Sequence, residues 1–193
     1  AYFQAVGSGT GAIAAWENAQ RLEEDGRFGD NNMHVYVGQN TPFTLIADSW
    51  KASSRELVAL DPDTGRRNAE MILAKVLANR KPPYSLAGGL FDVLSASKGD
   101  CLTCSNDELL YSMLLFRNLE GYDLLPAACC AVSSLLKAVQ SGLVKKNDFI
   151  MLNCTGGGSM ASMSAGYKLK EPDLIVSPDV DEDTLIRDVN SLF

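Results

Sequence analysis

The chain has 193 residues, of which 46% are hydrophobic and 21% are charged, and its formal net charge is −7. This length and composition predict one well-buried globular domain and exclude a disordered chain. The negative charge argues against partners such as nucleic acid or an acidic membrane, because both require a basic face that neutralises phosphates. The sequence also lacks an apolar run near the ~18 residues of a membrane span.

The five cysteines are scattered along the sequence and form no metal-binding motif. Cys101 and Cys104 have the spacing of half a zinc site, but a second pair is missing and the single histidine, His34, is distant in sequence. We therefore predict no metal site. Reduced thiols that serve as small core residues indicate a cytoplasmic protein.

The first residues already read as a strand, because the chain begins with Ala1-Tyr2 and carries neither an initiator Met nor a signal-peptide pattern. This start is typical of a cut made inside a longer protein, just before a structural element.

A glycine-rich turn follows this first strand and leads into a helix predicted over about residues 12–25, which Gly26 is placed to end. Glycines let backbone N–H groups approach an anion closely, and the start of a helix favours negative charge. The turn therefore predicts a phosphate cradle, with an ordinary tight turn as the alternative. Its residues are Gly7, Ser8, Gly9, Thr10 and Gly11, of which Ser8 and Thr10 add hydroxyl donors.

The residues after this turn indicate which class of phosphate-bearing ligand it would bind. A dinucleotide site needs an acidic residue at the end of the next strand, and the predicted strand 33–37 ends in Gly38-Gln39-Asn40 instead. A nucleoside triphosphate loop needs Gly-Lys followed by Ser or Thr, which the sequence lacks. A small phosphorylated cofactor or substrate fits better.

The middle of the chain alternates short apolar strands with helices, which predicts an α/β fold: a three-layer sandwich with a mainly parallel sheet. We expect a helix opened by Thr41-Pro42, a polar linker at 61–65 and an amphipathic helix around 71–77. A strand at 100–104 precedes a helix with a Ser105–Glu108 capping box that ends near Gly121. A buried helix from Pro126 to Gly142 and a strand at 149–152 complete the series.

A basic, proline-stiffened loop spans residues 79–85. Arg80 or Lys81 would suit an anionic substrate group, and Tyr84 would suit a pocket wall. The alternative, which we favour, is a rigid connection with a solvated basic pair.

A second glycine turn, Thr155-Gly156-Gly157-Gly158, follows the strand at 149–152. Ligands of open parallel sheets bind beyond the carboxyl ends of the strands, and both glycine turns lie at such ends. The first domain is thus expected to span 1–158. Residues 159–193 are expected to be a carboxyl-terminal extension packed on the same domain: a loop at 160–170, an edge strand at 175–176 and a last helix at 181–189.

Together these segments resemble the carboxyl-terminal half of the fold-type II pyridoxal-phosphate enzymes of the threonine synthase group, and more closely the archaeal cysteate synthases. The resemblance extends over nearly the whole chain up to Gly158. The stretches that carry it are 2–11, 13–17, 24–29, Asn79-Arg80, 82–84, 88–90, 119–121 and Leu152-Asn153.

The resemblance implies that pyridoxal 5′-phosphate is the cofactor, with its phosphate on the Gly7–Gly11 turn and its pyridine nitrogen facing the Thr155 hydroxyl. A neutral partner leaves this nitrogen largely unprotonated, which tunes how strongly the ring withdraws electrons. The implied reaction replaces the phosphate of O-phospho-L-serine with sulfite, giving L-cysteate on a route to coenzyme M. The partners implied are these small molecules, and the full-length enzyme is expected to be a homo-oligomer.

The family's Schiff-base lysine, and the asparagine that meets the ring oxygen, are expected outside this chain. We therefore assign no catalytic residue and predict that the chain alone is inactive. Two alternatives stay open: a threonine synthase acting on O-phosphohomoserine, and a non-enzymatic domain that binds a small phosphorylated effector. A nicotinamide-binding Rossmann domain ranks third because the ribose acid is missing.

Overall fold

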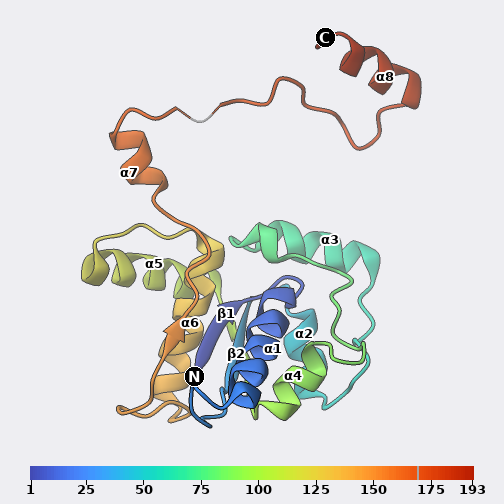
Figure 1. Cartoon of the computed structure of the whole chain (residues 1–193). Helices are drawn as coiled ribbons and strands as arrows, with labels where there is room; N and C mark the ends of the chain where they lie inside the picture. The colour runs from blue at the N-terminus through green and yellow to red at the C-terminus, as the bar shows by residue number, and fades with distance from the viewer. Residues whose placement is uncertain (169) are drawn as a thin grey trace. The chain divides into compact units, whose positions relative to one another are not determined.

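A computed structural model describes residues 1–168 and 170–193 of the chain (Figure 1). The structure divides into two compact units, residues 1–159 and residues 160–193. Each unit is described by itself.

The first unit is built on a four-stranded sheet with the order β3-β2-β1-β4. All neighbouring strands are parallel, with Tyr2 opposite both Val35 and Met151. Because the carboxyl ends of parallel strands meet at one edge of a sheet, the turns that follow β1 and β4 emerge side by side. The strands are β1 (Tyr2–Ala5), β2 (Val35–Asn40), β3 (Asp100–Cys104) and β4 (Met151–Leu152).

Helices cover both faces of this sheet (Figure 1). Tyr2 and Val35 point into a core shared with α1 (Thr10–Asp25), α2 (Leu45–Lys51) and α4 (Leu90–Ala96). Phe3 and Tyr36 point to the opposite face, where α6 (Pro126–Gln140) packs beside α5 (Asn106–Glu120). Successive residues of a strand face opposite sides, so both faces are buried. The predicted three-layer α/β sandwich with a parallel sheet is confirmed.

Several predicted helix ends are confirmed by their capping geometry. Helix α1 ends at Gly26, which has φ 74° and donates its N–H to the Glu23 carbonyl. Helix α5 begins with the predicted capping box, in which Ser105 and Glu108 each accept the other's backbone N–H. Helix α6 begins at Pro126 and is deeply buried.

Other boundaries correct the prediction. The segment expected as a polar linker at 61–65 begins a helix, α3 (Pro62–Met71), because Asp61 accepts the Thr64 N–H as its N-cap. The helix expected around 71–77 is broken at Ile72, whose backbone is extended, and only a short 3₁₀ turn at Lys75–Leu77 remains. Strand β2 runs to Asn40, so α2 starts at Leu45 and not at Thr41-Pro42.

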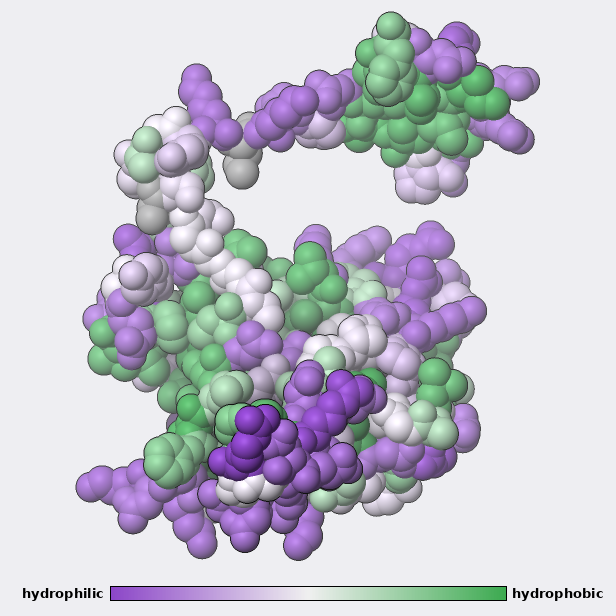
Figure 2. Space-filling view, in the orientation of Figure 1, coloured by the Kyte–Doolittle hydropathy of each residue, from purple (hydrophilic) through white to green (hydrophobic). Residues whose placement is uncertain are grey.

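The carboxyl-terminal segment contains two short helices, α7 (Ser159–Ser164) and α8 (Glu182–Asn190). The last helix was predicted, whereas α7 lies where a loop was expected and residues 175–176 form no strand. Apolar side chains gather on and beyond α8 (Figure 2), including the exposed Ile186 and Phe193. The packing of this segment on the first unit stays a prediction. Within the described ranges, no helix is both long and apolar enough to cross a membrane.

Candidate cofactor-binding site

The first glycine turn leads directly into the start of α1. Gly9 is the N-cap residue with φ 83°, and its carbonyl accepts the first backbone bond of the helix from Ile13 at 3.0 Å. The hydroxyls of Ser8 and Thr10 lie 2.9 Å apart above this end. The first N–H groups of a helix lack intrahelical partners, so this end presents backbone donors and two hydroxyls to an anion.

The three glycines of this turn pack closely against the residues behind it. A Cβ at Gly9 would lie 2.7 Å from Leu90 Cδ2, and a Cβ at Gly7 would lie 3.1 Å from the Leu77 backbone. At Gly11 a Cβ would overlap the side-chain amide of Gln4. The turn is thus a bare-backbone cradle, which is the form that a phosphate group fits.

The second glycine turn is tied to the chain on both sides of Thr155. The Asn153 N–H donates to the Phe3 carbonyl at 2.9 Å, and the Gly158 N–H donates to the Asp123 carbonyl at 2.7 Å. A Cβ at Gly157 would overlap the same Asp123 carbonyl, and Gly158 has φ 78°. Thr155 is exposed between these anchors. Its hydroxyl is therefore carried on a backbone fixed at both ends.

A chain of side-chain hydrogen bonds runs from Asn153, just before the second turn, to Gln4 on β1. The Asn153 amide donates to the Tyr2 hydroxyl at 2.8 Å, and this hydroxyl donates to Gln4 Oε1 at 2.6 Å. Gln4 in turn lies behind Gly11. Sequence reasoning assigned these three residues no role. Their positions could have indicated such a role, because Tyr2 and Gln4 share one face of β1 and Asn153 directly follows the neighbouring strand β4.

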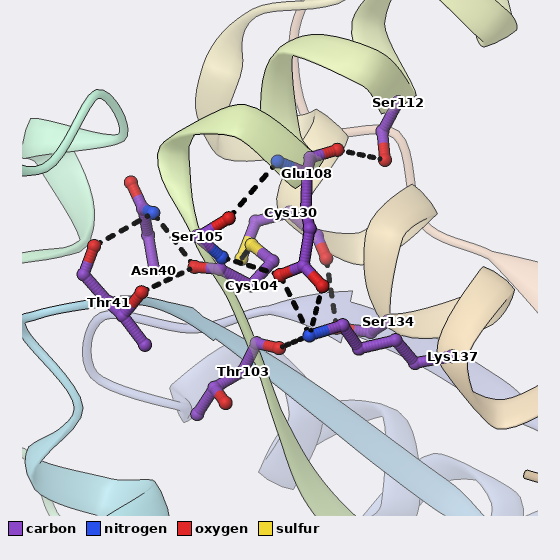
Figure 3. A network of polar contacts seen from close by, with 10 residues as sticks. All are labelled: Asn40, Thr41, Thr103, Cys104, Ser105, Glu108, Ser112, Cys130, Ser134 and Lys137. Atoms are coloured by element: carbon purple, nitrogen blue, oxygen red, sulfur yellow. Dashed lines mark hydrogen bonds and ion pairs between the residues drawn. The ribbon is translucent and has the colours of Figure 1, made fainter.

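A charged pair lies at the carboxyl end of β3 (Figure 3). Lys137 of α6 donates to the Thr103 carbonyl at 2.6 Å and to Glu108 at 2.8 Å. Partial burial acts to raise the pKa of Glu108, but hydrogen bonds from Lys137 and from the Ser105 backbone outweigh it, so the pKa lies below its usual value. This lysine is thus engaged in holding α6 to α5 and β3.

In the basic loop at 79–85, Pro83 borders the same hollow as Thr10 of the first turn, whereas Arg80 and Lys81 border a different one. Arg80 and Lys81 border a hollow of about 530 Å³ whose other wall is apolar and includes Leu45 and Leu57. Tyr84 is fully buried and donates to the Ser54 carbonyl at 2.9 Å, and burial raises the pKa of Tyr84 to about 12. Tyr84 is therefore a core residue and not a pocket wall, as the rigid-connection interpretation expects.

Among the described residues, no three His, Cys, Asp or Glu side chains gather as a metal site would need. A hollow of about 300 Å³ lies against the first turns of α1, between Thr10 and Gly88-Gly89. Of the predicted cofactor-binding residues, Thr10 lines this hollow.

The chain is similar to curated cysteate synthases of methanogenic archaea. It is 44% identical over 183 residues to that of Methanosarcina acetivorans and 45% identical over 158 residues to that of Methanocella paludicola. These matches cover 93% and 81% of this chain but only 44% and 37% of the two relatives. The chain thus spans less than half the length of the curated relatives it matches. No family model matches it.

Solved structures show the same fold at low sequence identity. Maize serine racemase has a TM-score of 0.59 at 12% identity, covering 99% of this chain and 46% of that one. Serine racemase from Dictyostelium discoideum has a TM-score of 0.56 at 14% identity, covering 82% of this chain and 43% of that one. The resemblance predicted from the sequence is thereby confirmed: the chain is similar to part of the cysteate synthases and has the fold of the fold-type II pyridoxal-phosphate enzymes.

Proposed function

We propose that this chain forms the cofactor-holding part of a cysteate synthase, which binds pyridoxal 5′-phosphate between its two glycine turns. The single observation that carries the proposal is their placement after β1 and β4, which are neighbouring parallel strands. A ligand with an anionic end and a ring nitrogen matches a backbone cradle on one strand end and a hydroxyl on the next.

The residues present fit this cofactor. The Gly7–Gly11 turn offers backbone donors where any Cβ at Gly9 or Gly11 would collide with its surroundings. Ser8 and Thr10 add hydroxyls at the same place. On the second turn, the neutral hydroxyl of Thr155 would accept or donate a single hydrogen bond at the ring nitrogen without imposing a full positive charge there.

The bound cofactor would supply an electron sink for removal of a substrate's α-proton. The two glycine turns of this chain would orient the cofactor by binding its two ends. The Asn153–Tyr2–Gln4 hydrogen bonds would keep the strands that carry these turns aligned. In the overall reaction that we propose, O-phospho-L-serine and sulfite give L-cysteate and phosphate. The small-molecule partners and a homo-oligomeric full-length enzyme belong to the same proposal.

A chimera tests this function. Residues 1–158 would replace the corresponding segment of the Methanosarcina acetivorans cysteate synthase, and products would be followed by mass spectrometry. We expect L-cysteate from O-phospho-L-serine only when sulfite is present. Threonine from O-phosphohomoserine without sulfite would instead assign the chain to the threonine synthases.

Two further measurements complete the test. A Thr155→Ala chimera should retain cofactor but lose about five- to tenfold in turnover, since one neutral hydrogen bond contributes roughly 1–1.5 kcal/mol. A chimera that folds and binds inorganic phosphate, yet neither takes up pyridoxal phosphate nor turns over either substrate, would support an effector-binding domain instead.

A further inference from the structure

Two buried cysteines face each other at the carboxyl end of β3 (Figure 3). The sulfur atoms of Cys104 and Cys130 lie 3.3 Å apart, and both residues are almost completely inaccessible to solvent. The first residue ends β3 and the second lies on α6. The proposed cofactor chemistry uses neither thiol, so this pair needs an explanation of its own.

The backbones on both sides of the pair are fixed. The Cys104 carbonyl accepts from the Thr41 N–H at 2.8 Å and from the Asn40 amide at 3.0 Å. On the other side, α6 approaches β2 closely because Gly38 has no side chain: a Cβ there would lie 3.0 Å from the Cys130 carbonyl. The short sulfur–sulfur distance is therefore set by the packing of β3 against α6.

The surroundings of the two thiols favour ionisation of one of them. The pKa of Cys104 is lowered, first by its hydrogen bond with the Cys130 thiol and further by the Ser133 hydroxyl and the Lys137 ammonium, which together outweigh the opposing effect of burial. The same hydrogen bond, together with burial, raises the pKa of Cys130. By contrast, burial raises the pKa of Cys101 and of Cys129. Of these four buried thiols, Cys104 is thus the one whose surroundings lower the pKa.

We propose that Cys104 and Cys130 form an oxidative modification site, a dithiol that a small peroxide converts reversibly into a disulfide. A disulfide bond is about 2.05 Å long, so the two sulfurs must approach by roughly a further 1.2 Å. The proposal is independent of the proposed function.

The reaction is balanced with hydrogen peroxide as the oxidant. The Cys104 thiolate attacks one peroxide oxygen, the O–O bond breaks, and a sulfenic acid and hydroxide form. The Cys130 sulfur then attacks the Cys104 sulfur and expels the second oxygen as hydroxide. The two thiols lose two electrons and two protons, and the peroxide becomes two molecules of water. A small dithiol reductant reverses the change.

Peptide mapping of the full chain tests the proposal. The reduced protein would be treated with a slight excess of hydrogen peroxide, alkylated, digested with trypsin and analysed by mass spectrometry. We expect a crosslink between the peptide of residues 99–117 and that of residues 118–137, which dithiothreitol removes. Wild-type protein that shows only oxidised Cys154, or no crosslink at all, overturns the proposal without recourse to any variant.

Matched variants assign the crosslink, because each of these peptides contains two cysteines. Cys104→Ser and Cys130→Ser should each abolish it. Cys101→Ser, on the same strand, and Cys129→Ser, on the same helix, should leave its yield unchanged. A crosslink that persists in Cys104→Ser but disappears in Cys101→Ser or Cys129→Ser would show that another pair reacts.

Discussion

The side-chain amide of Asn153 donates a hydrogen bond to the Tyr2 hydroxyl at 2.8 Å, and this contact ties the residue that follows β4 to the start of β1. The Tyr2 hydroxyl in turn donates a hydrogen bond to Gln4, whose side chain lies behind Gly11. A partly buried polar group costs free energy when its partner is removed. The three side chains should therefore respond to mutation as a unit.

Tyr2→Phe and Asn153→Ala test this unit in a double-mutant cycle followed by urea unfolding. Each single variant should lower the free energy of unfolding by about 1–2 kcal/mol. The two effects should be coupled by roughly 0.5–1.5 kcal/mol. Tyr36→Phe is the control, since the Tyr36 hydroxyl makes only a long 3.5 Å contact with the Leu143 carbonyl. Strictly additive effects of the two variants would contradict the linkage.

Gly9→Ala should destabilise the protein more than Gly26→Ala does. Both glycines have left-handed φ values, 83° and 74°, which cost a non-glycine residue about 1–2 kcal/mol. A Cβ at Gly26 meets open space, whereas one at Gly9 lies 2.7 Å from Leu90 Cδ2. Denaturant unfolding should show about 1–3 kcal/mol more loss for Gly9→Ala. Equal losses in the free energy of unfolding would mean that the Leu90 side chain moves aside without cost.

Gly38→Ala should be poorly tolerated because α6 packs directly on this position. A Cβ there would overlap the Ser134 hydroxyl and lie 3.0 Å from the Cys130 carbonyl. We expect a loss of about 2–4 kcal/mol in the free energy of unfolding. Ser134→Ala should recover part of it, because it removes one of the two obstacles. A Gly38→Ala variant with wild-type stability would mean that α6 shifts easily.

Glu108 should contribute a measurable pH dependence. Its pKa in the folded protein lies below the 4.5 of a free glutamate. The pair with Lys137 is therefore fully stabilising above pH 4.5, and its contribution is lost as the pH falls through the lower folded value. In Glu108→Gln, the free energy of unfolding should fall less steeply over this window than in the wild type. Glu70→Gln, an exposed position on α3, serves as the control.

Local chemistry made part of the fold predictable. The Ser105–Glu108 capping box and Gly26 fix helix ends through contacts between sequence neighbours, and both were predicted correctly. The segment at 61–65 was wrongly predicted to be a linker, because Asp and Pro are common both in turns and at the starts of helices. What decides for a helix is the Asp61 side chain, which accepts the Thr64 N–H.

The helix expected around 71–77 failed for a tertiary reason. The spacing of Met71, Ile72, Val76 and Leu77 suited a helix, but the backbone of Ile72 is extended. Ile72 and Leu77 are buried, whereas Met71 and Val76 are exposed. The candidate site was likewise only partly predictable from the sequence. Its glycine turns were visible as motifs, whereas the Asn153–Tyr2 bond spans 151 positions and leaves no periodic trace in the sequence.

The short edge strand β4 has a consequence for ligand exchange. It pairs with β1 at two positions, and Met151 is 65% exposed, while β1 lies between two neighbours. Edge segments with short ladders open locally at lower free energy than central strands. Amide protons near Leu152 should therefore exchange well before those of β2. In the function that we propose, the turn after β4 would therefore be the looser of the two holds on the cofactor, and its ring end would be released more readily than its phosphate end.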